Sequence, residues 1–193
     1  FANLAAGGFA CAHNGNLTNT EFLRKQLIKE GAIFQSSSDT EIILQLVAKS
    51  KKKNTIKKII DALFRIKGAY SLVVLTKDKM FGIKDPFGIR PLVLGKIGRS
   101  FVLSSETCAL DMIGAKYIRD IDNGEILEIS KTGLNSFRPF PKVNERPCIF
   151  ESIYFSRPDS KIKGKTVYMH RKELGVQLAL ENKINADYVV PIM

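Results

Sequence analysis

Short runs rich in β-branched and aromatic residues recur between positions 69 and 129, and turn residues separate them. A Lys-Asp pair at 77–78, glycines at 95 and 98, and Asp-Asn-Gly at 122–124 lie between successive runs. Short apolar runs with such residues between them are typical of antiparallel hairpins. The spacing therefore predicts strands over 69–75, 79–83, 91–94, 100–103, 116–121 and 125–129.

Helical patterns precede these strands. Thr18 and Glu21 have the spacing of a capping box, and the helix that they begin is predicted to end at Gly31. Ser38 and Glu41 repeat the spacing where a second helix begins near residue 39. A third helix is indicated by one apolar stripe, which consists of Ile56, Ile59, Ile60, Leu63 and Phe64. Helices on both faces of stacked sheets, an α+β fold, fit this order best.

The composition is that of a folded, cytoplasmic protein. The chain has 193 residues, of which 45% are hydrophobic and 25% charged, enough for one domain or one and a half. We find no apolar run long enough to cross a bilayer and no signal-peptide pattern, so we expect no membrane partner. Cys11, Cys108 and Cys148 are widely spaced, which argues against a disulfide framework and against a self-contained zinc site.

A formal net charge of +11 raises the question of nucleic-acid binding. The densest basic run, at 49–53, falls between two helical patterns and has no interleaved aromatic residues. A solvated loop between helices explains it better than a nucleic-acid surface, so we expect no nucleic-acid partner. The positive charge is still suited to attracting a polyphosphate substrate.

The pattern changes after residues 137–147, where three prolines and mixed charges interrupt the strands. Beyond this segment, 148–155 resembles a buried strand, 167–181 a helix and 188–192 another strand. A strand, a helix and a second strand in this order predict the opening of an α/β domain.

Two short motifs contain the candidate catalytic and substrate-binding residues. Asn14 and Gly15 can direct a side-chain amide and a backbone N–H at an oxygen that becomes negative during acyl transfer. The same Asn-Gly pair is also the strongest two-residue hairpin signal. Asp39 lies in the first turn of a predicted helix, where it either interacts with the helix dipole or binds the α-ammonium of an amino acid. Both alternatives remain open at each position.

Seven ordered motifs resemble those of the class II glutamine amidotransferases, whose glutaminase domain uses an N-terminal cysteine nucleophile. The later motifs are similar to the amidophosphoribosyltransferase branch of this family, and the resemblance covers essentially the whole chain. The motifs are HNGNL at 13–17, SDTE at 38–41, GAYS at 68–71, DPFGIRPL at 85–92, SSETCALD at 104–111, CIFE at 148–151 and YFSRPDS at 154–160.

The resemblance implies a fold and a domain organisation. Residues 1–140 would form a glutaminase domain that lacks its N-terminal part, with the four-layer αββα sandwich of N-terminal-nucleophile hydrolases. Residues 141–193 would be a linker and the first elements of an α/β phosphoribosyltransferase domain that lacks its C-terminal part. A structural role is expected for the loop at 85–92, whose Pro and Gly fix the backbone.

The resemblance also implies an activity. Glutamine would be hydrolysed to glutamate and ammonia, and the ammonia would convert 5-phosphoribosyl 1-diphosphate to 5-phosphoribosylamine, the first committed step of purine synthesis. Asn14 and Gly15 would form the oxyanion hole and Asp39 would bind the substrate's α-amino group. The family's nucleophile precedes the matched region, so this stretch alone is expected to be inactive. Cys11, in an apolar stretch, is interpreted as structural, and His13 is given no proton-transfer role.

Further expectations follow from the resemblance alone. Mg²⁺ would bind outside this stretch, and Cys148 is a candidate ligand of the [4Fe–4S] cluster that some members carry and others lack. Purine nucleotides would act as feedback inhibitors, and the protein would form a homo-oligomer. The alternatives are another class II amidotransferase, such as the hexosamine-forming enzyme or asparagine synthetase, and an inactive glutaminase-like binding or regulatory module.

Overall fold

The structure is a computed structural model that describes residues 1–4 and 7–190. It divides into two compact units, Phe1–Cys148 and Ile149–Met193. The division that the sequence predicts at 140/141 lies inside the first unit. The assignment of 141–193 to a phosphoribosyltransferase domain stays a prediction.

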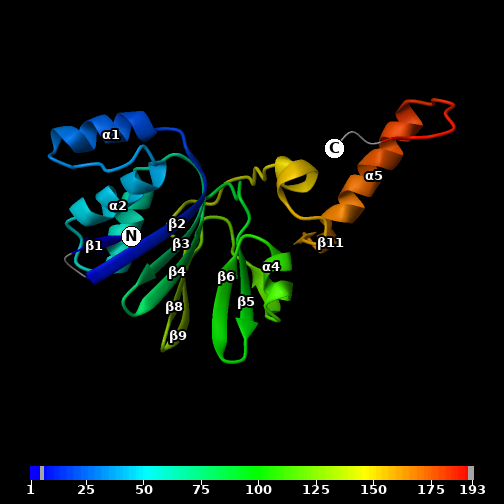
Figure 1. Cartoon of the computed structure of the whole chain (residues 1–193). Helices are drawn as coiled ribbons and strands as arrows, with labels where there is room; N and C mark the ends of the chain where they lie inside the picture. Colours follow the sequence, from blue (N-terminus) through cyan, green and yellow to red (C-terminus); the bar gives the residue numbers. More distant parts are fainter. Residues whose placement is uncertain (5–6, 191–193) are drawn as a thin grey trace. The chain divides into compact units, whose positions relative to one another are not determined.

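Two antiparallel sheets form the centre of the first unit (Figure 1). The larger sheet has the strand order β1-β2-β3-β4-β8-β9, and the smaller sheet has the order β6-β5-β7. The strands of the larger sheet are β1 (Ala2–Leu4), β2 (Gly7–Leu17), β3 (Gly68–Thr76), β4 (Lys79–Lys84), β8 (Ile126–Ser130) and β9 (Gly133–Phe137). The smaller sheet contains β5 (Val93–Ile97), β6 (Ser100–Ser104) and β7 (Lys116–Asp120).

Helices cover the outer faces of the two sheets, which gives four layers (Figure 1). The larger sheet packs against α1 (Thr20–Lys29), α2 (Asp39–Lys49) and α3 (Thr55–Leu63), and the smaller sheet packs against α4 (Thr107–Met112). Strand β3 shows the period of two that separates the layers. Leu72 and Val74 pack in the core under the helices, whereas Val73 packs between the sheets. The predicted four-layer αββα sandwich is therefore confirmed.

The packing between the layers explains two strand glycines. A Cβ atom on Gly82 of β4 would lie 2.9 Å from the side chain of Leu103, and one on Gly95 of β5 would lie 2.7 Å from Leu110. Leu110 is fully buried, and a buried leucine contributes roughly 1.5–3 kcal/mol of stability. Glycine at these strand positions therefore makes room for leucines of the next layer.

All six predicted strands exist, with shifted ends. Strand β5 starts at Val93 instead of residue 91, because Pro91 has no N–H to donate to a ladder. The predicted turns at 77–78, at Gly98 and at 122–124 are confirmed, and Gly98 and Gly124 have φ values of +56° and +74°. Gly95, which was also expected between two strands, lies inside β5. Strand β9 was not predicted.

The helix ends differ in part from the predicted caps. Helix α1 starts after Asn19 instead of Thr18, and the Asn19 side chain hydrogen-bonds the backbone of Arg65 and Lys67. Ser38 caps α2 as predicted, by accepting from the N–H of Thr40. The Glu41 carboxylate does not complete the box, since it accepts from the N–H groups at residues 35 and 36 in the preceding loop.

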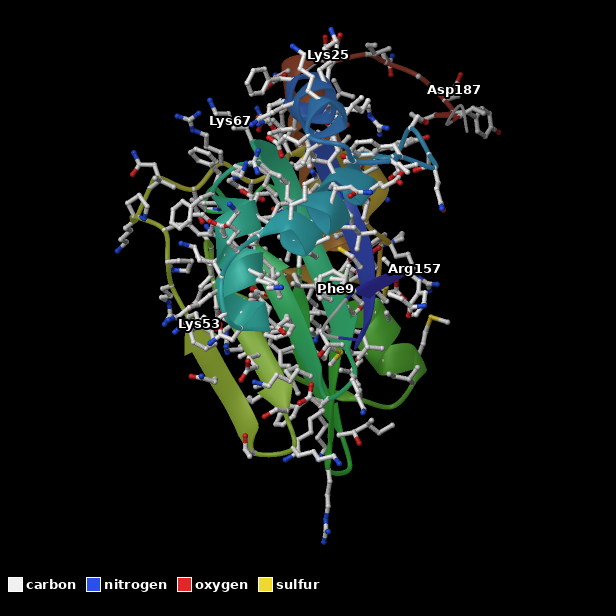
Figure 2. The ribbon with its side chains drawn as sticks, turned by 90° about the vertical axis from the view of Figure 1, so that its left-hand side faces the viewer. Phe9, Lys25, Lys53, Lys67, Arg157 and Asp187 are labelled. Atoms are coloured by element: carbon white, nitrogen blue, oxygen red, sulfur yellow. The ribbon has the colours of Figure 1, made fainter. Side chains whose placement is uncertain are left out.

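The lysines of the basic run at 51–53 are exposed between α2 and α3, as predicted for a solvated loop. Figure 2 shows Lys53 at the surface, and Lys25 and Lys67 also project outward. Phe9, in contrast, is buried on β2 under the helices.

The second unit contains η1 (Glu151–Phe155), β10 (Lys161–Ile162), β11 (Lys165–Thr166) and α5 (Val167–Glu181). The predicted helix at 167–181 is confirmed, but the predicted strand at 148–155 is wrong. A single π-helical turn replaces it, and the Ser156 hydroxyl closes this turn by donating to the buried Glu151 carboxylate over 2.9 Å. Of the strand predicted at 188–192, residues 188–190 are in no regular element, and residues 191–192 lie outside the described residues. In the part of the chain that is described, no helix has the length and apolar character needed to span a membrane.

Candidate functional site

Asn14 and Gly15 lie inside β2, beside β3. Asn14 is opposite Ser71 and Gly15 is opposite Tyr70 in the antiparallel pair. The hairpin-turn interpretation of Asn-Gly is therefore wrong. The backbone stays extended at Asn14 and Gly15 because both pair with β3, a strand that lies more than fifty residues later in the sequence.

The amide of Asn14 is held in one orientation. Arg90 Nε donates a hydrogen bond to Asn14 Oδ1 over 2.9 Å. A guanidinium has donors only, so the amide oxygen must face Arg90 and the amide nitrogen must face away from it. Asn14 Nδ2 donates to Ser105 Oγ over 3.3 Å. Asn14 therefore presents N–H donors, which are the groups that stabilise an oxyanion.

The loop between β4 and β5 holds Arg90 in place. Ser71 Oγ donates to the Arg90 carbonyl over 2.8 Å. The buried Asp85 carboxylate accepts from the N–H groups of Phe87 and Ile89 over 2.9 and 3.1 Å. Burial raises the pKa of Asp85, although these backbone donors act against the rise. These contacts agree with the structural role predicted for the loop, and the loop also holds Arg90 beside Asn14.

Sequence reasoning gave Arg90 no part in the site. Its partner Asn14 is 76 positions away in the chain, so no local pattern joins the two residues. The only signal available was that Arg90 belongs to one of the seven motifs.

Gly15 is at a position that only glycine fits. Its φ is +150°, and a Cβ atom there would lie 2.1 Å from the Ala69 carbonyl oxygen of β3 and 2.8 Å from His13 Nε2. Neither atom has room to move away, because one is backbone and the other belongs to a buried ring. The missing side chain therefore allows β2 and β3 to pair closely next to Asn14.

Asp39 lies at the same end of β2. Its Oδ2 accepts from the N–H of Leu17, the last residue of β2, over 3.0 Å. Its Oδ1 lies 3.4 Å from His13 Nδ1, and 22% of its side chain is exposed. Asp39 starts α2, where the helix dipole favours a negative charge. The position of Asp39 is compatible with both interpretations. Its carboxylate stabilises the start of the helix and also remains accessible to an ammonium group.

The environment of Cys11 makes it unsuited to act as a nucleophile. It is half-buried on β2 and packs against the core under the helices. Burial raises the pKa of its thiol to about 12, so the thiolate form that a nucleophile requires is scarce at neutral pH. The structural interpretation of Cys11 is confirmed.

Cys148 is a free, half-buried cysteine whose N–H donates to the carbonyl of Ile89 over 3.0 Å. Among the residues that the structure describes, no three His, Cys, Asp or Glu side chains are grouped to hold a metal ion. A [4Fe–4S] cluster takes four thiolates. Within residues 1–4 and 7–190, therefore, the cysteines do not assemble a cluster site.

The arrangement places two kinds of groups at one end of β2. Asn14 and Gly15 supply N–H donors, and Asp39 supplies an anchored carboxylate. Together they are complementary to a ligand with an amide or acyl oxygen at one end and an ammonium group at the other.

Known proteins resemble this chain over its whole length. The family model described as "Glutamine amidotransferase domain" matches residues 1–112. Amidophosphoribosyltransferase of Rhizobium etli is 48% identical over an alignment that covers 100% of this chain and 40% of that protein. The Bacillus subtilis amidophosphoribosyltransferase is 44% identical, with 96% and 39% covered. The chain thus spans about 40% of the length of these curated relatives.

Solved structures of related proteins are also similar to this chain. Glutamine phosphoribosylpyrophosphate amidotransferase from B. subtilis, complexed with ADP and GMP, superposes with a TM-score of 0.93 at 43% identity, and 97% of this chain and 41% of that chain are covered. A glutamine aminotransferase class-II domain protein from Silicibacter pomeroyi has a TM-score of 0.52 at 17% identity, with 72% and 69% covered, and shares the fold alone.

Proposed function

Because the chain belongs to the glutamine amidotransferase domain family, we propose that it is the glutamine-hydrolysing part of an amidophosphoribosyltransferase. Glutamine and water would give glutamate and ammonia. The ammonia would displace diphosphate from 5-phosphoribosyl 1-diphosphate and give 5-phosphoribosylamine, the first committed step of purine synthesis. The observation that carries this proposal is the convergence of Asn14, Gly15 and Asp39 at one end of β2.

We assign roles to these residues from their contacts. Asp39 binds the α-ammonium of glutamine, because its carboxylate is anchored by the N–H of Leu17 and partly exposed. A thiolate attacks the side-chain carbonyl, and the oxygen that becomes negative is stabilised by Asn14 Nδ2 and the N–H of Gly15. The proton that the thiol lost passes to the amide nitrogen, so that collapse of this intermediate releases ammonia and leaves a thioester, which water hydrolyses to glutamate and the free thiol. The nucleophile is assigned to an N-terminal cysteine of the mature protein, not to Cys11.

We also propose substrates, a metal cofactor and inhibitors for the full-length protein. Glutamine and 5-phosphoribosyl 1-diphosphate are the substrates, and Mg²⁺ acts with the second of them. A relative was solved with ADP and GMP bound, which supports purine nucleotides as feedback inhibitors. We also propose a homo-oligomer in the cytoplasm, although one relative that is 45% identical is named a chloroplastic enzyme of Arabidopsis thaliana. Cys148 would be a cluster ligand only together with thiolates outside the described residues.

The test uses the full-length protein that contains this chain. Glutamate and diphosphate are measured with glutamine and 5-phosphoribosyl 1-diphosphate as substrates, and fructose 6-phosphate or aspartate with ATP replaces the second substrate in parallel reactions. We expect equal amounts of glutamate and diphosphate, with kcat lowered about 100-fold or more by Asn14→Ala. Product with fructose 6-phosphate or aspartate would identify another class II amidotransferase. If glutamine is not hydrolysed, the remaining hypothesis is that the protein is a glutaminase-like binding or regulatory module.

A further inference from the structure

His13 is buried between the two halves of the candidate site. Only 2% of its side-chain surface is exposed. The ring, which is carried by β2, contacts two other segments. Nε2 lies 3.3 Å from the Ala69 carbonyl oxygen on β3, and Nδ1 lies 3.3 Å from Thr40 Oγ1 on α2. The ring is thus an internal link between the strand that carries Asn14 and Gly15 and the helix that carries Asp39.

The Ala69 carbonyl fixes the role of one ring nitrogen. A carbonyl oxygen only accepts, so Nε2 of His13 must carry a hydrogen and donate it. Thr40 has one hydroxyl hydrogen, which it donates to Asp39 Oδ1 over 3.5 Å, and His13 Nδ1 lies 3.3 Å from the same hydroxyl oxygen. His13 Nδ1, Thr40 Oγ1 and Asp39 Oδ1 therefore form one polar triangle.

This triangle lies next to both parts of the candidate site, the Asp39 carboxylate and Gly15. Asp39 Oδ1 lies 3.4 Å from His13 Nδ1, while Asp39 Oδ2 is held separately by the N–H of Leu17. On its other side, the His13 ring fills the space where a Cβ atom of Gly15 would lie 2.8 Å from Nε2. The His13 ring therefore lies between the Asp39 carboxylate and Gly15.

We propose that His13 and Thr40 are positioning residues for glutamine, which hold Asp39 Oδ1 at the distance from the oxyanion donors that the substrate's α-ammonium requires. This inference rests on the proposed function. Because Asp39 contacts the α-ammonium equally before and during the reaction, a displaced carboxylate weakens binding more than it slows the chemical step.

The first test compares Thr40→Val with Thr40→Ser in the full-length protein. Valine has nearly the same shape as threonine but no hydroxyl, whereas serine keeps it. We expect Thr40→Val to raise the KM for glutamine about tenfold with kcat changed less than about threefold, and Thr40→Ser to restore the KM. The matched control is Thr76→Val, which removes a hydroxyl that donates to Lys79 O, away from this triangle, and should leave the KM unchanged.

Two His13 variants test the same idea without Thr40. Asparagine places its amide near the position of Nδ1 and so keeps the contact with Thr40, whereas glutamine reaches the position of Nε2 and keeps the contact with Ala69. We expect His13→Asn to have a KM for glutamine within about threefold of wild type and His13→Gln to raise it about tenfold. The opposite order would overturn the inference.

Activity with ammonium chloride in place of glutamine reports whether each variant is folded, because ammonia bypasses this site. An unchanged KM in Thr40→Val, or a fall in kcat alone, overturns the positioning role while wild-type glutamine hydrolysis still supports the proposed function. If wild type does not hydrolyse glutamine, the proposed function itself fails. If Thr40→Val loses activity with ammonium chloride as well, the two His13 variants decide the question.

Discussion

Arg90 Nε and Asn14 Oδ1 are joined by a 2.9 Å hydrogen bond that connects the β4–β5 loop to the candidate oxyanion strand. The bond selects one of the two orientations of the Asn14 amide, since a guanidinium accepts no hydrogen bond. An amide that is fixed before substrate arrives needs no reorganisation when charge develops on the substrate oxygen. On the proposed function, Arg90 acts through Asn14, and its effect should appear in the chemical step.

Arg90→Lys should lower the kcat of glutamine hydrolysis about tenfold with little change in KM, because a lysine ammonium does not reproduce the direction of the Nε–H bond. Steady-state kinetics of glutamate formation measure this. Ser105→Ala is the control, because a hydroxyl both donates and accepts and so does not select the orientation of the Asn14 amide. A wild-type kcat in Arg90→Lys would contradict the orienting role.

Gly15→Ala should destabilise the protein by about 3 kcal/mol or more, because the new Cβ atom would lie 2.1 Å from the Ala69 carbonyl oxygen and force β2 away from β3. Denaturant unfolding measures the loss. Gly133→Ala is the matched control, since Gly133 also lies in a strand with positive φ, at +117°, but has open space where the Cβ atom would be. That variant should lose only about 1–2 kcal/mol. Equal losses would show that the backbone angle matters and the contact does not.

Cys11 should resist alkylation in the native protein. Its thiol, with a pKa of about 12, provides very little thiolate for reaction with iodoacetamide at about pH 8. Mass spectrometry of the labelled protein measures the modification, and the same reaction in denaturant should label Cys11 fully. Cys11→Ala should also retain glutamine hydrolysis in the full-length protein. Rapid native labelling that abolishes this activity would argue for a catalytic Cys11.

Glu125 should make stability depend on acid pH. Burial would raise its pKa, but the paired Arg119 guanidinium, the N–H of Asp122 and the Ser136 hydroxyl together lower the pKa from 4.5 to about 2. A pKa that is lower in the folded state stabilises the protein above the unfolded value, and this contribution disappears as pH falls from about 4.5 to about 2. The shift corresponds to about 3 kcal/mol.

Glu125→Gln should therefore lose up to about 3 kcal/mol at pH 7, with a difference from wild type that shrinks below about pH 4.5. Unfolding in urea at several pH values measures both quantities. Glu21→Gln is the control, because the carboxylate of Glu21 pairs with Lys25 on the exposed surface of α1 and should contribute no measurable stability. A difference that is constant with pH would contradict the ionic origin of the stabilisation.

Local sequence signals determined much of this fold. The apolar stripe predicted α3, the helix at 167–181 has the predicted ends, and Ser38 caps α2 as its spacing indicated. The turn residues at 77–78 and at Gly98 located the β3–β4 and β5–β6 hairpins. These features depend on neighbours within a few positions, where backbone propensity and side-chain caps act directly.

Only the tertiary structure decided where Asn14 and Gly15 lie. Asn-Gly has the local chemistry of a turn, yet pairing with β3 keeps both residues in a strand. The partners that give the site its geometry, Arg90 for Asn14 and Ala69 for His13, lie 76 and 56 positions away. A hydrogen bond between such distant residues depends on how the layers pack, because no local periodicity specifies which side chains meet across two elements.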